Sequence, residues 1–206
     1  MNEPSQAGED GLIRLDLRFP IWDRVFTPAS LVVVGTREGD GYDLAPKHMV
    51  TPLGWEGHFG FVCTPSHGTY QNVQEHGTFT VSFPRPDQVV VTSLTAAPRC
   101  GNEEEPTPGL SSLPTLPAEV VEGRVLRDAH LVLECELDRI VDDFGRASLI
   151  AGRVVAARAP AEAVRATGVE DEEVIRRSPL LVYVNPGRYA EITKTHPFPF
   201  PAGFQR

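Results

Sequence analysis

The residues best suited to ligand chemistry lie in three short pieces between positions 43 and 72. Residues 43–46 read Asp-Leu-Ala-Pro, residues 47–51 read Lys-His-Met-Val-Thr, and residues 66–72 read Ser-His-Gly-Thr-Tyr-Gln-Asn. The third piece predicts the start of a helix, with Ser66 as the N-cap and Thr69 three positions later. Backbone amides and the helix dipole at such a point form an anion site that suits a phosphate. Lys47 and His48 supply the nearest N–H donors for the same phosphate.

Each of these residues also has a purely structural interpretation. Helix capping accounts for Ser66 and Thr69 without a ligand. A single lysine in a loop, such as Lys47, is usually solvated, and His48 fits a surface turn. Asn72, in the first turns of the expected helix, is suited to bonding a loop carbonyl. Local sequence therefore leaves helix capping and phosphate binding open as alternatives.

The elements around these residues are mainly short strands. Apolar and β-branched runs predict strands over residues 30–35, 59–63, 78–83, 119–126, 130–141, 147–157 and 180–184, with a further short strand that ends at residue 44. Short helices are expected over residues 70–76, where Gly77 suits the C′ position, and over 86–97 and 169–177. Regular alternation of strand and helix is missing, which disfavours a doubly wound parallel sheet. The expected fold class is mainly β, an antiparallel, closed or half-closed β-barrel with short helices.

Length and composition fit one domain of 206 residues. The apolar fraction of 41% and the charged fraction of 23% are typical of a globular protein. Residues 1–12 are expected to form a flexible N-terminus and residues 195–206 an extended C-terminal tail. Residues 100–117, rich in Glu, Pro, Gly and Ser, predict an exposed loop, and residues 142–145, Asp-Asp-Phe-Gly, predict a hairpin turn.

Composition and missing motifs argue against several classes of function. The formal net charge of −9 disfavours nucleic acid and an anionic membrane as partners. The three cysteines are scattered, and no Cys-x-x-Cys or His-Glu-x-x-His occurs, so neither a disulfide framework nor a metal site is expected. A Gly-x-Gly-x-x-Gly motif and a Gly-x-Ser-x-Gly elbow are also absent. Residues 1–10 are unlike a signal peptide and no apolar run spans a bilayer, so we expect a cytoplasmic protein.

Taken in order, the motifs resemble the flavin reductase-like family with the FMN-binding split barrel, which includes the flavoredoxins. In that family one strand carries Asn-x-Ala-Pro-x-Ser, and a later helix begins with a motif like Lys-Asp-Thr-x-x-Asn. The matching residues here are 43–48, Asp-Leu-Ala-Pro-Lys-His, and 67–72, His-Gly-Thr-Tyr-Gln-Asn. Residues 79–83 resemble the next family strand, residues 149–155 the penultimate barrel strand, and residues 180–183 and 187–189 the closing Pro-Leu-x-Tyr…Gly-x-Tyr. The similarity covers residues 25–192.

The resemblance implies an FMN-binding split barrel that works as a homodimer, with FMN at the dimer interface and FAD as the alternative flavin. Thr69 and its neighbours are expected near the phosphate, and residues 45–51 along the isoalloxazine. The cofactor-binding residues that it implies are Ala45, Pro46, Lys47, His48, Thr51, Ser66, His67, Gly68, Thr69 and Asn72. NAD(P)H is the expected co-substrate: a nicotinamide nucleotide passes hydride to the flavin, which reduces a second acceptor that the sequence does not identify. No catalytic dyad is expected, because the cofactor carries the chemistry.

Departures from the family pattern keep three hypotheses open. Asp43 stands where Asn is usual, and His48 where Ser usually meets the flavin. Residues 52–58 lack the usual Asp-Pro-Pro run, so Trp55 and His58 are candidates to lie beside the ring, with packing of Trp55 in the dimer interface as the alternative. The leading hypothesis is an NAD(P)H-dependent flavin reductase or flavoredoxin-like oxidoreductase. The second is a non-enzymatic flavin-binding electron carrier, and the third a split barrel that binds another planar ligand.

Overall fold

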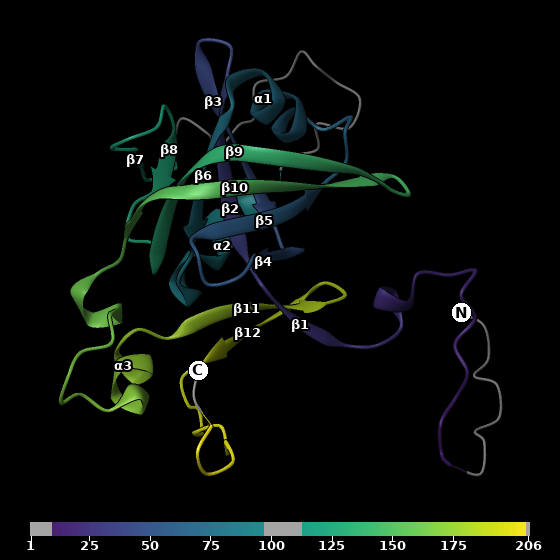
Figure 1. The fold of residues 1–206 in the computed structure, drawn as a ribbon, viewed down its shortest axis with the longest axis vertical. Helices are drawn as coiled ribbons and strands as arrows, with labels where there is room; N and C mark the ends of the chain where they lie inside the picture. The colour runs from purple at the N-terminus through teal and green to yellow at the C-terminus, as the bar shows by residue number, and fades with distance from the viewer. Residues whose placement is uncertain (1–9, 97–112, 205–206) are drawn as a thin grey trace.

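Antiparallel strands dominate the computed structural model, which describes residues 10–96 and 113–204. Seven strands form one sheet whose spatial order differs from the chain order. From edge to edge they are β3 (Gly41–Lys47), β2 (Val32–Glu38), β6 (Thr78–Phe83), β9 (Leu131–Phe144), β10 (Ala147–Arg158), β5 (His58–Cys63) and β4 (Val50–Pro52). Every pairing between neighbours is antiparallel. The sheet curls into a half-barrel (Figure 1).

Two smaller sheets and several short helices complete the fold. One sheet pairs β11 (Leu180–Asn185) with β1 (Thr27–Ser30) on one side and β12 (Arg188–Ile192) on the other, which joins distant parts of the chain. The second pairs β7 (Thr115–Pro117) with β8 (Arg124–Leu126). The α-helices are α1 (Gly68–His76), α2 (Val89–Leu94) and α3 (Asp171–Arg177), and the 3-10 turns are η1 (Ile21–Asp23), η2 (Pro86–Gln88) and η4 (Ala161–Ala163). The helices of the described residues are all too short or too polar to cross a membrane.

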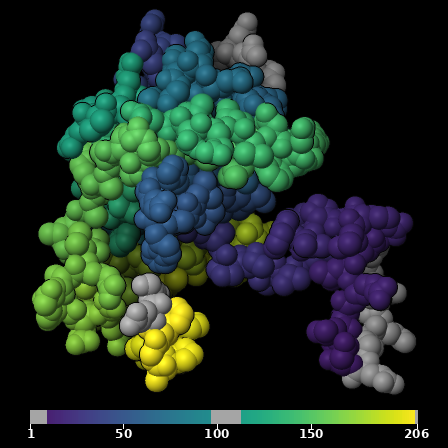
Figure 2. Space-filling view, in the orientation of Figure 1, coloured from purple at the N-terminus to yellow at the C-terminus, as the bar shows by residue number. Residues whose placement is uncertain are grey.

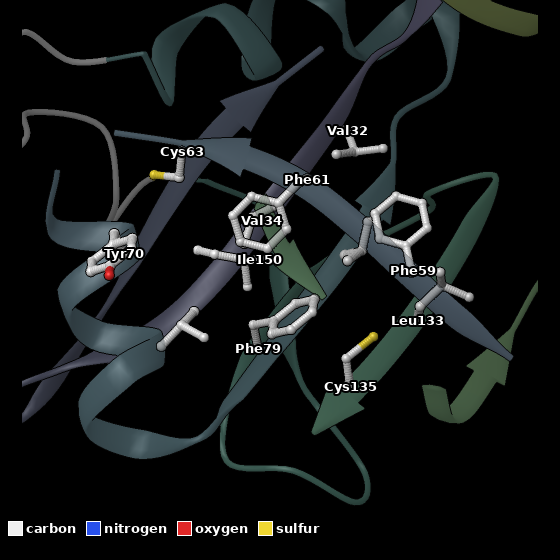
Figure 3. Packing of buried hydrophobic residues seen from close by; sticks show 12 residues of the cluster. Val32, Val34, Phe59, Phe61, Cys63, Tyr70, Phe79, Leu133, Cys135 and Ile150 are labelled. Atoms are coloured by element: carbon white, nitrogen blue, oxygen red, sulfur yellow. The ribbon is translucent and has the colours of Figure 1, made fainter. Parts of the chain in front are cut away.

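Strand β2 is buried on both faces, which explains its continuous apolar sequence. Because successive side chains on a strand point to opposite faces, Val32 and Val34 enter one hydrophobic cluster and Val33 enters another. The first cluster fills the half-barrel beneath α1. At its centre the rings of Phe61 and Phe79 meet edge to face with their centroids 5.2 Å apart (Figure 3).

The predicted fold class is confirmed, and most strands lie where the sequence predicts them. The strand expected over 78–83 is β6, and those expected over 59–63, 130–141 and 147–157 are β5, β9 and β10. The helix expected over 70–76 is α1, and Gly77 ends it in the left-handed conformation with φ of 68°. The helix expected over 86–97 is divided between η2 and α2.

The strand predicted over residues 119–126 is wrong for most of its length, because only β8 at its end is extended. The buried carboxylate of Glu134 accepts backbone N–H groups from Glu119, Val120 and Val121 over 2.9, 2.7 and 3.0 Å. Three consecutive amides that converge on one carboxylate curl the chain. The apolar pattern of the segment gave no sign of this long-range acceptor.

Two loop predictions also need correction. Within the loop predicted over 100–117, residues 115–117 form strand β7, while residues 100–112 lie outside the described residues. The hairpin predicted at 142–145 exists, but β9 continues through Phe144, and the two-residue turn is Gly145-Arg146 before Ala147. Asp143 and Gly145 both have positive φ, which bends the chain at this end. The flexible terminus predicted over 1–12 falls mainly on residues 1–9, outside the described residues, as do residues 205–206 of the predicted tail.

Gly152 on β10 is expected to tolerate no side chain. A Cβ there would lie 2.5 Å from two carbons of the Phe79 ring, which is fully buried. We therefore expect Gly152→Ala to lower the free energy of unfolding by about 1–3 kcal/mol, the usual penalty for overpacking. Urea denaturation measures this, with Gly41→Ala as the control, because a Cβ at Gly41 meets nothing closer than 3.7 Å. Equal stability of the two variants would contradict the packing described.

Candidate functional site

Helix α1 is fixed to three different strands by hydrogen bonds from its own side chains. The pairs are Thr69 Oγ1 to Asp43 Oδ2 on β3 (3.2 Å), Asn72 Nδ2 to Thr36 Oγ1 on β2 (3.0 Å) and Tyr70 Oη to Asp142 Oδ1 on β9 (3.1 Å). Thr69, Asn72, Asp43 and Thr36 are buried. A helix of 9 residues is too short to be stable alone. These bonds, together with the packing of Val73, therefore set where the N-terminus of α1 lies.

The N-terminus of α1 begins one residue later than the sequence predicts. His67, in an extended conformation, is the N-cap, and no side chain caps the helix. The prediction that Ser66 is the N-cap is therefore wrong: Ser66 is exposed within the preceding turn, where the His67 amide bonds the carbonyl of Thr64 over 2.9 Å. The amides of Gly68 and Thr69 precede any intrahelical acceptor, so they are suited to an external one.

The ammonium of Lys47 lies half-buried at the end of β3, next to the end of β5. Its Nζ is 3.5 Å from Sγ of Cys63. Within residues 10–96 and 113–204, no carboxylate forms an ion pair with Lys47. Asp43, four residues earlier on the same strand, is about 13 Å away along β3. A partly buried cation beside a neutral thiol is poorly compensated, which favours an anionic ligand.

Lys47 also sets the electrostatics of two neighbouring imidazoles. Burial lowers the pKa of His48 below its usual value, and the charge of Lys47 lowers it further. The pKa of His67 is lowered by the same two causes in the same order. Burial raises the pKa of the Cys63 thiol, against the opposing charge of Lys47. At neutral pH the cluster therefore holds one permanent cation, two neutral imidazoles and a protonated thiol, and each imidazole offers one N–H donor and one acceptor.

His48 is held by an aromatic side chain from the three-stranded sheet. Its ring stacks on Tyr183 of β11, with centroids 4.4 Å apart and an angle of 27° between the planes. The hydroxyl of Tyr183 accepts the backbone N–H of Gly187 over 2.8 Å. Tyr183 is therefore held by its hydroxyl, and the imidazole that stacks on its ring has a defined orientation.

The structure divides the predicted site residues into three groups. Lys47, His48 and His67 lie together around the end of β3, with Ala45 and Pro46 half-buried on the same strand and Ser66 and Gly68 beside His67. Thr69 and Asn72 face the sheet, and their side chains bond Asp43 and Thr36. Thr51 on β4 pairs with Gly60, three positions before Cys63, and its hydroxyl donates to the carbonyl of Pro52. Contact of each residue with a flavin stays a prediction.

Trp55 and His58 lie at the other end of β5 from the Lys47 cluster. Trp55 is 90% exposed in the connection between β4 and β5, and His58 begins β5. Five residues separate His58 from Cys63, about 17 Å along the strand. Any role for these two side chains beside the ring stays a prediction.

Sequence reasoning missed three partners in this region. The sequence marks Asp43 only as a departure from a motif, Cys63 only as one of three scattered cysteines, and Tyr183 only as part of the closing strand. Each acquires its role through a contact between distant segments, so no local spacing identifies it. The sequence offers one signal for this region, which concerns Lys47 itself: lysine is rare, and the chain contains only Lys47 and Lys194.

The arrangement is suited to binding a phosphorylated ligand. The ammonium of Lys47, the two imidazole N–H groups and the amides at the start of α1 are all donors, and an anion near them gains charge-assisted hydrogen bonds. The part of the chain that the structure describes contains no cluster of three or more His, Cys, Asp or Glu side chains able to hold a metal ion.

Comparison with known proteins gives one family and a group of similar structures. The family model described as "Flavin reductase like domain" matches residues 24–193. The flavoredoxin of Methanosarcina acetivorans has 19% identity and a TM-score of 0.73, covering 93% of this chain and 97% of its own. The 2-nitrobenzoate 2-nitroreductase of Pseudomonas fluorescens has 18% identity and a TM-score of 0.73, covering 98% and 99%. An FMN-binding protein from Thermus thermophilus has 22% identity and a TM-score of 0.68, covering 83% and 90%. Among curated protein sequences, no match is found.

Thr69→Val tests whether the Thr69 hydroxyl serves the fold. The buried Asp43 carboxylate would lose a donor, so we expect the free energy of unfolding to fall by about 1–3 kcal/mol. Urea denaturation measures the change, and Thr69→Ser, which keeps the hydroxyl, is the matched control. Unchanged stability of Thr69→Val together with weaker ligand binding would instead assign the hydroxyl to the ligand.

Lys47→Met tests the electrostatics of the cluster. Removing the ammonium should raise the pKa of both His48 and His67, while burial, the larger cause in each case, keeps both below about 6.5. NMR titration of the ring C–H signals measures the two values. His130 is an internal control, because burial alone lowers its pKa. A shift of His130 as large as those of His48 and His67 would point to a global change rather than the loss of a local charge.

Proposed function

The chain belongs to the family of flavin reductase-like domains, and on this premise we propose that it is an oxidoreductase that binds FMN and takes electrons from NAD(P)H. The observation that carries the proposal is the half-buried ammonium of Lys47, which bonds the thiol of Cys63 and whose charge acts on His67, the N-cap of α1. A phosphate is the group that this set of donors suits best. FMN carries such a phosphate, and FAD is the alternative.

The residues of the cluster have separate roles in this proposal. Lys47 and the amides of Gly68 and Thr69 bind the phosphate. Residues 45–51 would line the isoalloxazine, and His48, kept neutral and held by Tyr183, would offer the ring one N–H donor. Thr69 and Asn72 act indirectly, because their side chains hold α1 against β3 and β2.

A bound flavin would supply the redox chemistry, namely hydride acceptance from a reduced nicotinamide and electron transfer to a second acceptor. The protein's part is to orient the ring, exclude water from one of its faces and keep the phosphate end fixed. The neutral imidazole of His48 adds no charge beside the ring, so the local field there is set by Lys47.

The similar structures support two versions of this function. Among them are the flavin reductase component of a bacterial two-component tryptophan halogenase and an NADH:FAD oxidoreductase from Streptomyces globisporus, and also two flavoredoxins. The first two names describe turnover of a reduced nicotinamide or reduction of flavin, while a flavoredoxin-like role requires only reversible electron transfer. Both versions need the same flavin site.

We expect the purified protein to bind FMN more tightly than riboflavin, because riboflavin lacks the phosphate. Lys47→Met should weaken FMN binding by about 1.5–3 kcal/mol, roughly tenfold to 150-fold, and leave riboflavin binding nearly unchanged. Quenching of flavin fluorescence measures all four affinities. Lys194→Met is the matched control, since Lys194 is the other lysine and is exposed. Equal loss for FMN and riboflavin would refute a phosphate contact at Lys47.

The redox step is tested separately by adding NADH or NADPH to the flavin complex without oxygen. Bleaching of the flavin absorbance by either nucleotide supports the reductase. A flavin complex that dithionite bleaches but neither nicotinamide reduces would identify an electron carrier. Failure to bind any flavin would refute the proposal as a whole.

A further inference from the structure

The carboxylate of Glu38 lies against the first residue of α1. Glu38 is the last residue of β2 and is opposite Gly41 in the hairpin that joins β2 to β3. A Cβ placed on Gly68 would lie 3.3 Å from Oε1 of Glu38. The tip of the hairpin and the start of α1 are therefore side by side, at one end of the molecule (Figures 1 and 2).

The register between β2 and α1 explains this contact. Thr36 and Glu38 are two residues apart on β2, so their side chains point to the same face of the sheet. Gly68 and Asn72 are four residues apart on α1, so they lie on the same face of the helix. Thr36 accepts the hydrogen bond from Asn72, and Glu38, two residues further along the strand, meets Gly68. The position of Glu38 thus follows from the way α1 packs on β2.

The start of α1 is also the place where an anion gains most from the helix. No side chain of the N-cap residue His67 caps α1, and the amides of Gly68 and Thr69 precede any intrahelical acceptor. These amides carry the positive end of the helix dipole, so a carboxylate beside them is stabilised. The phosphate of the proposed flavin would gain from the same amides. One set of donors therefore faces two anions, a carboxylate of the chain and the phosphate of a ligand.

Two carboxylates face the first turn of α1, and they differ in how easily they can move. Asp43 is 4% exposed and accepts the hydroxyl of Thr69 over 3.2 Å. Displacing it would break a buried hydrogen bond to a charged group, which is costly. Glu38 is exposed at the end of its strand, so its carboxylate can turn toward water without losing solvation. Glu38 is therefore the carboxylate that an anionic ligand can displace.

We propose that Glu38 determines how tightly the site holds an anionic ligand, because its carboxylate competes with the flavin phosphate for the start of α1. The inference rests on the proposed function and adds a specificity-determining residue to it. Like charges that share one helix start repel each other, so the phosphate binds when the carboxylate moves aside. Glu38 lowers the affinity for FMN through the phosphate alone, which favours exchange of FMN over permanent retention.

The test compares FMN with riboflavin in Glu38→Gln, which removes the charge and keeps the size of the side chain. We expect FMN to bind at least about tenfold more tightly than to the parent protein, and riboflavin to bind with unchanged affinity, because only FMN carries the phosphate. Quenching of flavin fluorescence measures both affinities. Asp40→Asn is the matched control, since it removes one charge from the exposed tip of the same hairpin and should change either affinity less than about twofold.

Urea denaturation of the flavin-free protein gives a second readout. Glu38→Gln should lower the denaturation midpoint, because α1 loses a negative charge at its start, and Asp40→Asn should leave the midpoint unchanged. Lower stability together with tighter FMN binding is the signature of competition. A purely structural role for Glu38 would lower stability and FMN affinity together, and that result overturns the inference, as does an equal change of affinity for FMN and riboflavin.

Failure of this inference and failure of the proposed function give different results. If FMN binds equally well to the parent protein and to Glu38→Gln, the flavin site stands and Glu38 is not part of it. If neither protein binds a flavin, the proposed function fails, and inorganic phosphate becomes the probe of the competition. Phosphate should then shift the amide NMR signals of Gly68 and Thr69 at a lower concentration in Glu38→Gln than in the parent. Equal concentrations, or no shift in either protein, would rule out competition by Glu38.

Discussion

The hydrogen bond between Thr69 and the buried carboxylate of Asp43 is the contact on which the candidate site depends. Helix α1 is too short to persist without tertiary contacts, and this bond joins its first turn to β3. Strand β3 also carries Lys47 at its end, so one strand both positions the helix start and supplies the cation beside it. The geometry of the candidate site is therefore set by the pairing of β3 with β2 and by the buried polar contacts beneath α1.

The distribution of charge along β3 explains how an acidic protein can accommodate an anion. Asp43 and Lys47 point to different surroundings: the carboxylate is buried against α1, and the ammonium is half-buried next to Cys63. Their separation along the strand prevents the two from neutralising each other. The neutral imidazoles nearby add donors without adding charge. A net charge of −9 thus coexists with a half-buried ammonium at the end of β3, while the carboxylate of Asp43 lies toward the other end of the strand against Thr69.

The sequence was sufficient for features that depend on neighbouring residues and insufficient for those that depend on distant ones. The apolar runs of β2, β5 and β6 predicted buried strands, and Gly77 predicted the end of α1. Strand β1 was not predicted, because Pro28 interrupts a short polar stretch and the strand forms only through pairing with β11 near the other end of the chain. Serine is a residue type that favours the N-cap position, yet the N-cap of α1 is His67, one residue after Ser66. The Lys47–Cys63 contact arises from the curl of the seven-stranded sheet, and the His48–Tyr183 contact from the placement of the three-stranded sheet against it; no local pattern encodes either.

The three-stranded sheet connects two parts of the molecule that the chain order keeps apart. The segment that precedes β1 enters this sheet directly, β1 pairs with β11, and Tyr183 of β11 supports His48. A shift of β1 against β11 would move the ring on which the imidazole rests. Both the segment before β1 and the imidazole of His48 therefore rest on the same strand, β11. The small sheet is thus the structural connection between the segment before β1 and the end of β3 that carries Lys47 and His48.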